Sequence, residues 1–104
     1  MAVVEITTEN FETEVLQSDR PTIVDFWADW CAPCKHLSPM VDEISEETDE
    51  IKICKVNIDE QPQLAQRFRV MSIPTLIVFK DGEVRNTSVG LIPKNAILDL
   101  VKGI

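Results

Sequence analysis

The sequence predicts an α/β domain in which a mixed central sheet of about five strands is flanked by four helices. Short runs of β-branched and aromatic residues alternate with segments in which apolar residues recur every three or four positions. The 104 residues suffice for one domain and are too few for two. No repeat or low-complexity tract divides them, so we expect a single domain over residues 1–104.

Two elements are expected before the first long apolar run. Residues 3–6 are short and β-rich, which predicts a strand. Asn10 is a candidate cap for a helix over residues 11–16. Phe11 and Val15 are four residues apart in that helix and therefore share one face.

Residues 21–28 are almost continuously apolar, as in a strand that is covered on both faces. One carboxylate, Asp25, interrupts this run. After Trp30 the period changes to that of a long amphipathic helix, whose apolar positions are Leu37, Met40, Val41 and Ile44.

The second half of the chain contains three more strand-like runs, at residues 51–56, 75–79 and 84–89. A short helix is expected at residues 63–68, and Asp81-Gly82 is a strong hairpin signal. Pro93 opens a C-terminal amphipathic helix with apolar positions at Ile97, Leu100, Val101 and Ile104. The order is β-α-β-α-β-α-β-β-α; strands separated by helices should run parallel, and the terminal hairpin adds antiparallel strands.

Composition restricts the partners. Eighteen acidic and ten basic residues give a net charge of −8, which repels phosphate backbones and anionic membranes, so we expect neither nucleic acid nor membrane as a partner. No apolar run approaches the roughly 18 residues of a membrane-spanning helix. The first residues lack the basic and apolar regions of a signal peptide, so a cytoplasmic location is expected.

The motif Cys31-Ala-Pro-Cys34 lies where the buried strand gives way to the long helix. The first turn of a helix offers unpaired N–H groups and the positive end of its dipole, and both stabilise a thiolate. Residues three apart place both sulfurs on one helical face, close enough to bridge, and Pro33 fits a first turn. We expect Cys31 to be the attacking nucleophile and Cys34, one turn deeper, to resolve the mixed disulfide.

The chain resembles the thioredoxin family over essentially its whole length. The matching segments occur in the family's order and spacing: Val24-Asp-Phe-Trp-Ala28, Trp30 to Lys35, Lys55-Val-Asn-Ile-Asp59, Ser72-Ile-Pro-Thr75, Phe79-Lys-Asp-Gly82 and Val89-Gly90. The resemblance implies a thioredoxin fold and a protein-disulfide reductase that carries electrons. An external reductase, a flavoprotein using NADPH, would restore the dithiol; no bound cofactor or metal is implied, and we expect a monomer.

The resemblance also implies roles for single residues. Pro74 falls where the family has a cis-proline beside the cysteine pair, and Ile73 before it would offer backbone hydrogen bonds to the target. Lys55 matches a lysine near the family's buried carboxylate, and Trp30 and Gly90 fall at positions flanking the contact surface.

Three further residues concern the chemistry between and beneath the cysteines. Asp25 matches the family's buried carboxylate; burial should raise its pKa toward the working pH, so that it exchanges a proton with Cys34. The alternative is a structural carboxylate paired with Lys55. Ala32 stands where most of the family has Gly, so the reducing strength does not follow from the resemblance. We place Ala32 and Pro33 against the bound substrate.

A zinc site is the main alternative for the cysteines, since His36 and Cys54 would complete a Cys₃His set. His36 lies two residues from Cys34, about 200° around the helix, and Cys54 lies within a strand, where a small apolar role is favoured. Two other function classes remain open: an oxidant or isomerase of the same fold, and a binding module that ignores its thiols.

Overall fold

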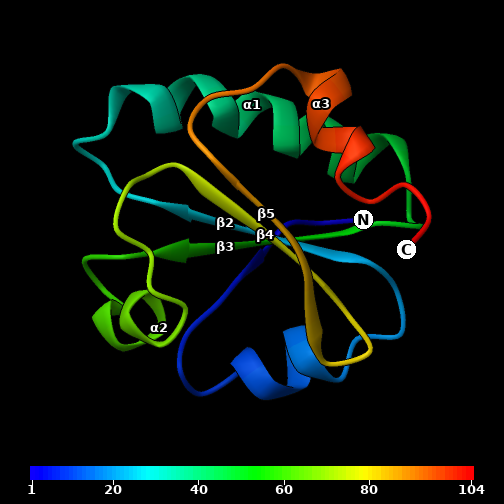
Figure 1. Ribbon diagram of the computed structural model, residues 1–104, viewed down its shortest axis with the longest axis horizontal. Coiled ribbons are helices and arrows are strands. Elements are labelled where there is room, and N and C mark those ends of the chain that lie inside the picture. Colours follow the sequence, from blue (N-terminus) through cyan, green and yellow to red (C-terminus); the bar gives the residue numbers. More distant parts are fainter.

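A computed structural model describes all 104 residues of the chain (Figure 1). Its five strands are β1 (Val4–Glu5), β2 (Thr22–Trp27), β3 (Lys52–Asn57), β4 (Thr75–Lys80) and β5 (Glu83–Val89). They form one mixed sheet in the order β1-β3-β2-β4-β5. Strands β1, β3 and β2 are parallel, whereas β4 runs antiparallel to β2 and β5 antiparallel to β4.

The four helical elements are η1 (Glu12–Leu16), α1 (Ala32–Glu47), α2 (Pro62–Arg67) and α3 (Lys94–Asp99). Helices α1 and α3 lie on one face of the sheet, and η1 and α2 lie toward the other (Figure 1). None of these helices is long and apolar enough to cross a membrane. The predicted fold class, a mixed sheet of five strands with four helices, is therefore confirmed.

Each face of the sheet has its own core. The α1 face buries eight apolar residues, namely Ile23, Leu37, Val41, Ile44, Ile53, Leu76, Val78 and Ile97. The opposite face buries ten: Ile6, Phe11, Val15, Val24, Phe26, Cys54, Val56, Leu64, Ile77 and Phe79. Neighbouring residues of β2, β3 and β4 thus serve opposite layers, because successive side chains of a strand alternate between its faces.

The Asp81-Gly82 turn has the predicted form. Both residues have a positive φ, 54° and 79°, and Lys80 pairs with Glu83 across them. Two successive residues in the left-handed region match the twist of a two-residue hairpin, and glycine at the second position adopts that region freely.

The structure corrects the expected cap at Asn10. Its Oδ1 accepts the Thr7 N–H at 2.7 Å, and its Nδ2 donates to the Glu5 carbonyl at 3.0 Å. The Asn10 side chain therefore hydrogen-bonds to the segment before it, and the helix begins without a side-chain cap.

Two further expectations on the second half need correction. Strand β4 is antiparallel to β2 although a helix separates it from β3, because the chain through α2 does not return to the end of the sheet where β3 starts. The first residue of β4, Thr75, pairs with Phe26, which also pairs with Val56 near the end of β3. Helix α3 ends at Asp99, because Leu100 and Val101 donate to the third residue before them, as in a 3₁₀ turn. The apolar positions from Leu100 to Ile104 still pack on the α1-side core.

Candidate functional site

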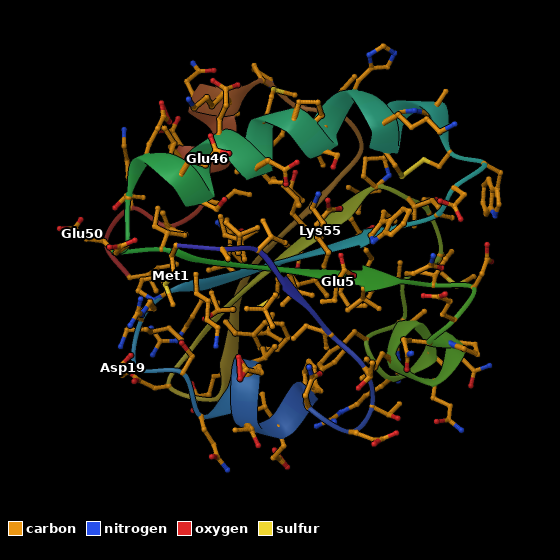
Figure 2. The ribbon with its side chains drawn as sticks, turned by 180° about the vertical axis from the view of Figure 1, so that it is seen from behind. Met1, Glu5, Asp19, Glu46, Glu50 and Lys55 are labelled. Atoms are coloured by element: carbon orange, nitrogen blue, oxygen red, sulfur yellow. A yellow bond between two sulfur atoms is a disulfide. The ribbon has the colours of Figure 1, made fainter.

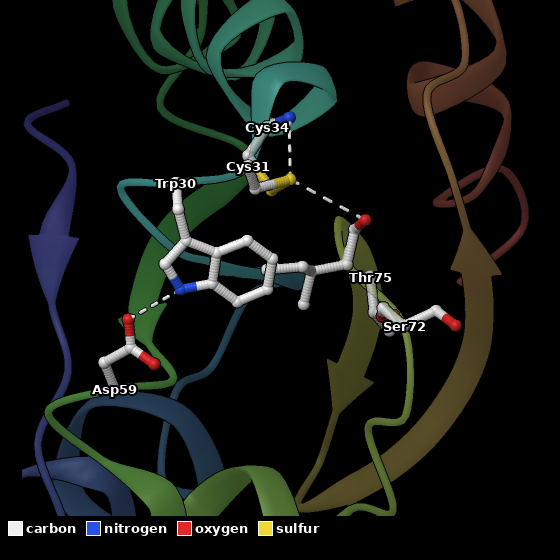
Figure 3. The surroundings of a disulfide bond; sticks show 7 residues. Trp30, Cys31, Cys34, Asp59, Ser72 and Thr75 are labelled. Carbon is white, nitrogen blue, oxygen red and sulfur yellow. Dashed lines mark hydrogen bonds between the residues drawn. A yellow bond between two sulfur atoms is a disulfide. The ribbon is translucent and has the colours of Figure 1, made fainter.

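The cysteine pair lies between the end of β2 and the start of α1. Cys31 is the residue that caps α1, and Cys34 lies in its first turn together with Pro33. The two cysteines form a disulfide with a Cα–Cα distance of 5.3 Å (Figure 3). The predicted placement of both sulfurs at a helix start is therefore confirmed.

The two sulfurs have different surroundings. Cys31 Sγ accepts the backbone N–H of Cys34 at 3.2 Å and lies 3.7 Å from the Ile73 carbonyl oxygen (Figure 3). Exposure hardly separates them, since Cys31 is 4% and Cys34 is 2% exposed. Donation from a helix N-terminus stabilises negative charge on sulfur, so the structure favours thiolate character at Cys31.

Three chain segments surround the disulfide. Trp30 is 69% exposed, and its indole N–H donates to Asp59 Oδ2 at 2.9 Å (Figure 3). The Ile73–Pro74 peptide is cis, as the family resemblance implies. Gly90 donates its N–H to the Pro74 carbonyl at 2.8 Å and has a φ of +100°, which glycine adopts without strain.

Apolar surface flanks these segments. Ala32 and Pro33 are exposed between the cysteines, and Ile73 is half-buried. Met71 is exposed two residues before Ile73, and Leu91 is exposed directly after Gly90. Exposed apolar side chains around the Cys31–Cys34 disulfide indicate a contact surface for another molecule.

Asp25 is the one buried carboxylate of the sheet. It is 1% exposed, and neither of its carboxylate oxygens has a hydrogen-bond partner. Burial raises its pKa from 3.8 to about 7; Lys55 opposes this shift, whereas the negative charges of Asp42 and Glu5 add to it. The carboxyl group can therefore gain or lose a proton near neutral pH, as predicted.

Lys55 is the register partner of Asp25 on β3, but it does not form an ion pair with it. Its ammonium instead contacts Asp42 Oδ1 at 2.9 Å and donates to the Ser38 hydroxyl. The direct Asp25–Lys55 ion pair of the structural alternative is therefore not formed, although the charge of Lys55 still acts on Asp25. A cavity of about 270 Å³ lies next to this arrangement, and its lining includes Cys34, Lys55, Ser38 and Trp27.

Sequence reasoning missed four residues of this site. Asp59, the acceptor for Trp30, belongs to a matching family segment but received no role. Ser38 and Asp42 lie one helical turn apart on α1 and signal nothing individually. Glu5 pairs in register with Lys55 from β1, and only the sheet order places it there.

The zinc alternative finds no support in the side-chain arrangement. No three His, Cys, Asp or Glu side chains come together in a way that would hold a metal ion. Cys31 and Cys34 bond to each other, and Cys54 is fully buried in the core on the opposite face of the sheet. Burial raises the pKa of Cys54 to about 12, so it stays a neutral apolar side chain, as predicted.

A disulfide closed across four residues at a helix start, with a protonatable carboxyl nearby, suits reversible thiol–disulfide exchange. The Thioredoxin family model matches residues 2–103. The chain is 50% identical over 97 residues to "Thioredoxin" of Rickettsia prowazekii, with 92% of each chain covered. It is 47% identical over 93 residues to "Thioredoxin 1" of Synechococcus elongatus, covering 88% of this chain and 87% of the other. The chain therefore belongs to the thioredoxin family of protein-disulfide oxidoreductases.

Proposed function

We propose that the chain reduces disulfides of other proteins, with Cys31 as the nucleophile and Cys34 as the resolving thiol. The observation that carries this assignment is the asymmetry of the two sulfurs. Only Cys31 Sγ accepts a helix N-terminal N–H, and it lies beside the carbonyl of Ile73 in the loop that borders the exposed apolar surface. A thiolate there is stabilised and faces the substrate side of the site.

The reaction then has two exchange steps. The Cys31 thiolate attacks one sulfur of the target disulfide, forms a mixed disulfide, and releases the other target sulfur as a thiolate that takes up a proton. The Cys34 thiol loses its proton and attacks Cys31 Sγ. The bond from Cys31 to the target breaks, and the second target sulfur leaves as a thiolate that also takes up a proton. The target gains two electrons and two protons, and the protein ends with the Cys31–Cys34 disulfide.

We assign the proton transfer in the second step to Asp25. Its carboxyl lies on the same face of β2 as Trp27, and its register partner on β3, Lys55, lines the cavity together with Cys34 and Trp27. A water in that cavity would connect the carboxylate with the Cys34 thiol. A group with a pKa of about 7 both accepts and returns a proton at neutral pH, which suits a general base.

The exposed segments around the disulfide supply the target site in this proposal. Trp30, Ala32 and Pro33 would contact the target on one side, and Ile73 and Gly90 on the other. Pro74 would shape the groove between them through the backbone. Apolar contacts and main-chain hydrogen bonds suit extended segments of many different proteins.

As a member of the family, the chain has disulfide-containing proteins as its targets and a reductase as its partner. We further propose that the reductase is a flavoprotein using NADPH, and that the protein works in the cytoplasm as a monomeric single domain. The net charge of −8 supports protein targets over nucleic acids or anionic membranes.

A trapping experiment tests the roles of the cysteines. The reduced Cys34→Ser variant should accumulate a covalent mixed disulfide with a disulfide-bonded target protein, because the resolving thiol is missing. Cys31→Ser should accumulate none, and the matched control Cys54→Ser should turn over like the unmodified protein. Mass spectrometry of the adducts gives the result. Trapping by Cys31→Ser instead of Cys34→Ser would reverse the assignment. Target binding without any mixed disulfide, unchanged when both cysteines are replaced, would indicate a binding module that ignores its thiols.

A further inference from the structure

A row of charged side chains crosses the three parallel strands beneath α1. Glu5 on β1 pairs in register with Lys55 on β3, and Lys55 pairs in turn with Asp25 on β2. Figure 2 shows Lys55 beside Glu5, below helix α1. One ammonium is thus placed between two carboxylates on the neighbouring strands, yet it forms an ion pair with neither of them.

Two side chains of helix α1 hold the Lys55 ammonium. Its nitrogen lies 2.9 Å from Asp42 Oδ1 and donates to the hydroxyl of Ser38. Ser38 and Asp42 are four residues apart on α1, so both project from the same side of the helix. They give Lys55, which is 9% exposed, two oxygen acceptors on the helix side of the cavity.

We propose that Ser38 and Asp42 are positioning residues that hold the Lys55 ammonium on the α1 side of the cavity, so that the Asp25 carboxyl has no ion-pair partner. The inference deepens the proposed function and rests on it in one respect, namely that Asp25 carries the proton of Cys34. The arrangement of the four side chains stands without that role.

The chemical consequence follows from the competition for one ammonium. A carboxylate with an ammonium within about 4–6 Å ionises much more easily than one without. If Lys55 turned down to Asp25, its charge would offset the burial that now raises the pKa of that carboxyl to about 7. With Lys55 held by α1, its charge still lowers the pKa of Asp25, but burial dominates, and the charges of Asp42 and Glu5 act in the same direction as burial.

The first measurement is the titration of the Asp25 carboxyl carbon by NMR in the oxidised protein. Cys31 and Cys34 are joined there and do not titrate, so one carboxyl is followed without coupling to a thiol. Asp42→Asn should lower the titration midpoint of Asp25 by about one pH unit. Ser38→Ala, which changes no charge, should lower it by a smaller amount.

Glu43→Gln is the matched control. It removes one negative charge from the same helix, but Glu43 is exposed and contacts Lys94 instead of Lys55. This variant should leave the midpoint of Asp25 where it is. An equal shift from Glu43→Gln and Asp42→Asn would overturn the positioning role, because net charge alone would then explain both.

Asp42 also acts on Asp25 through its own charge, so the titration is repeated in a Lys55→Met background. If Asp42 acts mainly by holding the ammonium, Asp42→Asn should shift the midpoint less than half as far there. Equal shifts in the two backgrounds, or no shift in either, would overturn the proposal.

The two proposals fail separately. If resolution of the mixed disulfide is unchanged in Asp25→Ala, Asp25 is not the proton carrier, whereas the titration results still test how Lys55 is held. If that rate falls but the cycle with Lys55→Met shows no coupling, Asp25 keeps its role and the positioning by Ser38 and Asp42 is wrong.

Discussion

The two faces of the sheet are built from alternate residues of the same strands, but they have different chemistry. On the η1 and α2 face the strands bury mostly apolar side chains, and the one lysine there, Lys52, pairs with Glu14 of η1. Four phenylalanine rings pack together on this face, those of Phe11, Phe26, Phe68 and Phe79. On the α1 face an apolar core gives way to Asp25 and Lys55.

The difference separates stability from chemistry. The aromatic layer buries large apolar area and needs no charge, so it contributes to the free energy of unfolding. The α1 face loses stability by burying Asp25, whose carboxyl titrates near neutral pH. The register partner of Asp25, Lys55, lines the same cavity as Cys34. Changes on the two faces should therefore affect different measurements.

The largest effect on stability is expected on the aromatic face. Phe79 is 1% exposed, and its ring lies 5.8 Å from that of Phe11 and 5.3 Å from that of Phe68. Phe79→Ala should lower the free energy of unfolding by about 3–5 kcal/mol, measured by urea denaturation. The rate of target reduction by the folded variant should stay within twofold; a much slower rate would show that this face contributes to the chemistry.

Asp25→Asn, unlike Phe79→Ala, should raise the free energy of unfolding, and should do so only above about pH 4. The native protein raises the pKa of Asp25 from 3.8 to about 7, so it holds a proton that the unfolded chain releases between these values. The stability from this group is complete below about pH 4 and is lost as the pH rises through 7.

The variant should therefore be more stable than the unmodified protein at pH 8, by up to about 4 kcal/mol, and the two should converge near pH 4. Urea denaturation at both pH values measures this. A difference that does not depend on pH would mean that the side chain does not titrate in this range.

Cys54→Ala gives a smaller effect that compares the thiols of the two faces. Cys54 is fully buried among the apolar residues of the η1 side. Removing its sulfur leaves a small void and should destabilise the protein by about 1 kcal/mol. The midpoint potential of the Cys31–Cys34 couple should not move; a shift would indicate that Cys54 takes part in exchange.

Much of this division was visible in the sequence. Asp25 stood out because a carboxylate interrupts an apolar strand, and Cys31-Ala-Pro-Cys34 marked a helix start. The contacts of Lys55 could not be predicted, because they depend on strand register and on which of three nearby carboxylates its flexible side chain reaches. The Asn10 side chain can likewise hydrogen-bond either to the helix after it or to the segment before it, and residue propensity does not predict which of the two it does. The direction of β4 depended on where α2 lies, which local periodicity does not record.

The central claim, that the charged end of the α1 face serves Cys34, is tested most directly by the rate of the second exchange step. The mixed disulfide would be formed in rapid-mixing experiments at pH 7.5 with the unmodified protein and with Asp25→Ala, and its decay followed. Loss of a general base should slow this decay by about 100-fold while leaving the attack by Cys31 almost unchanged. A decay rate within twofold of that of the unmodified protein would contradict the account and leave Asp25 without a part in the reaction.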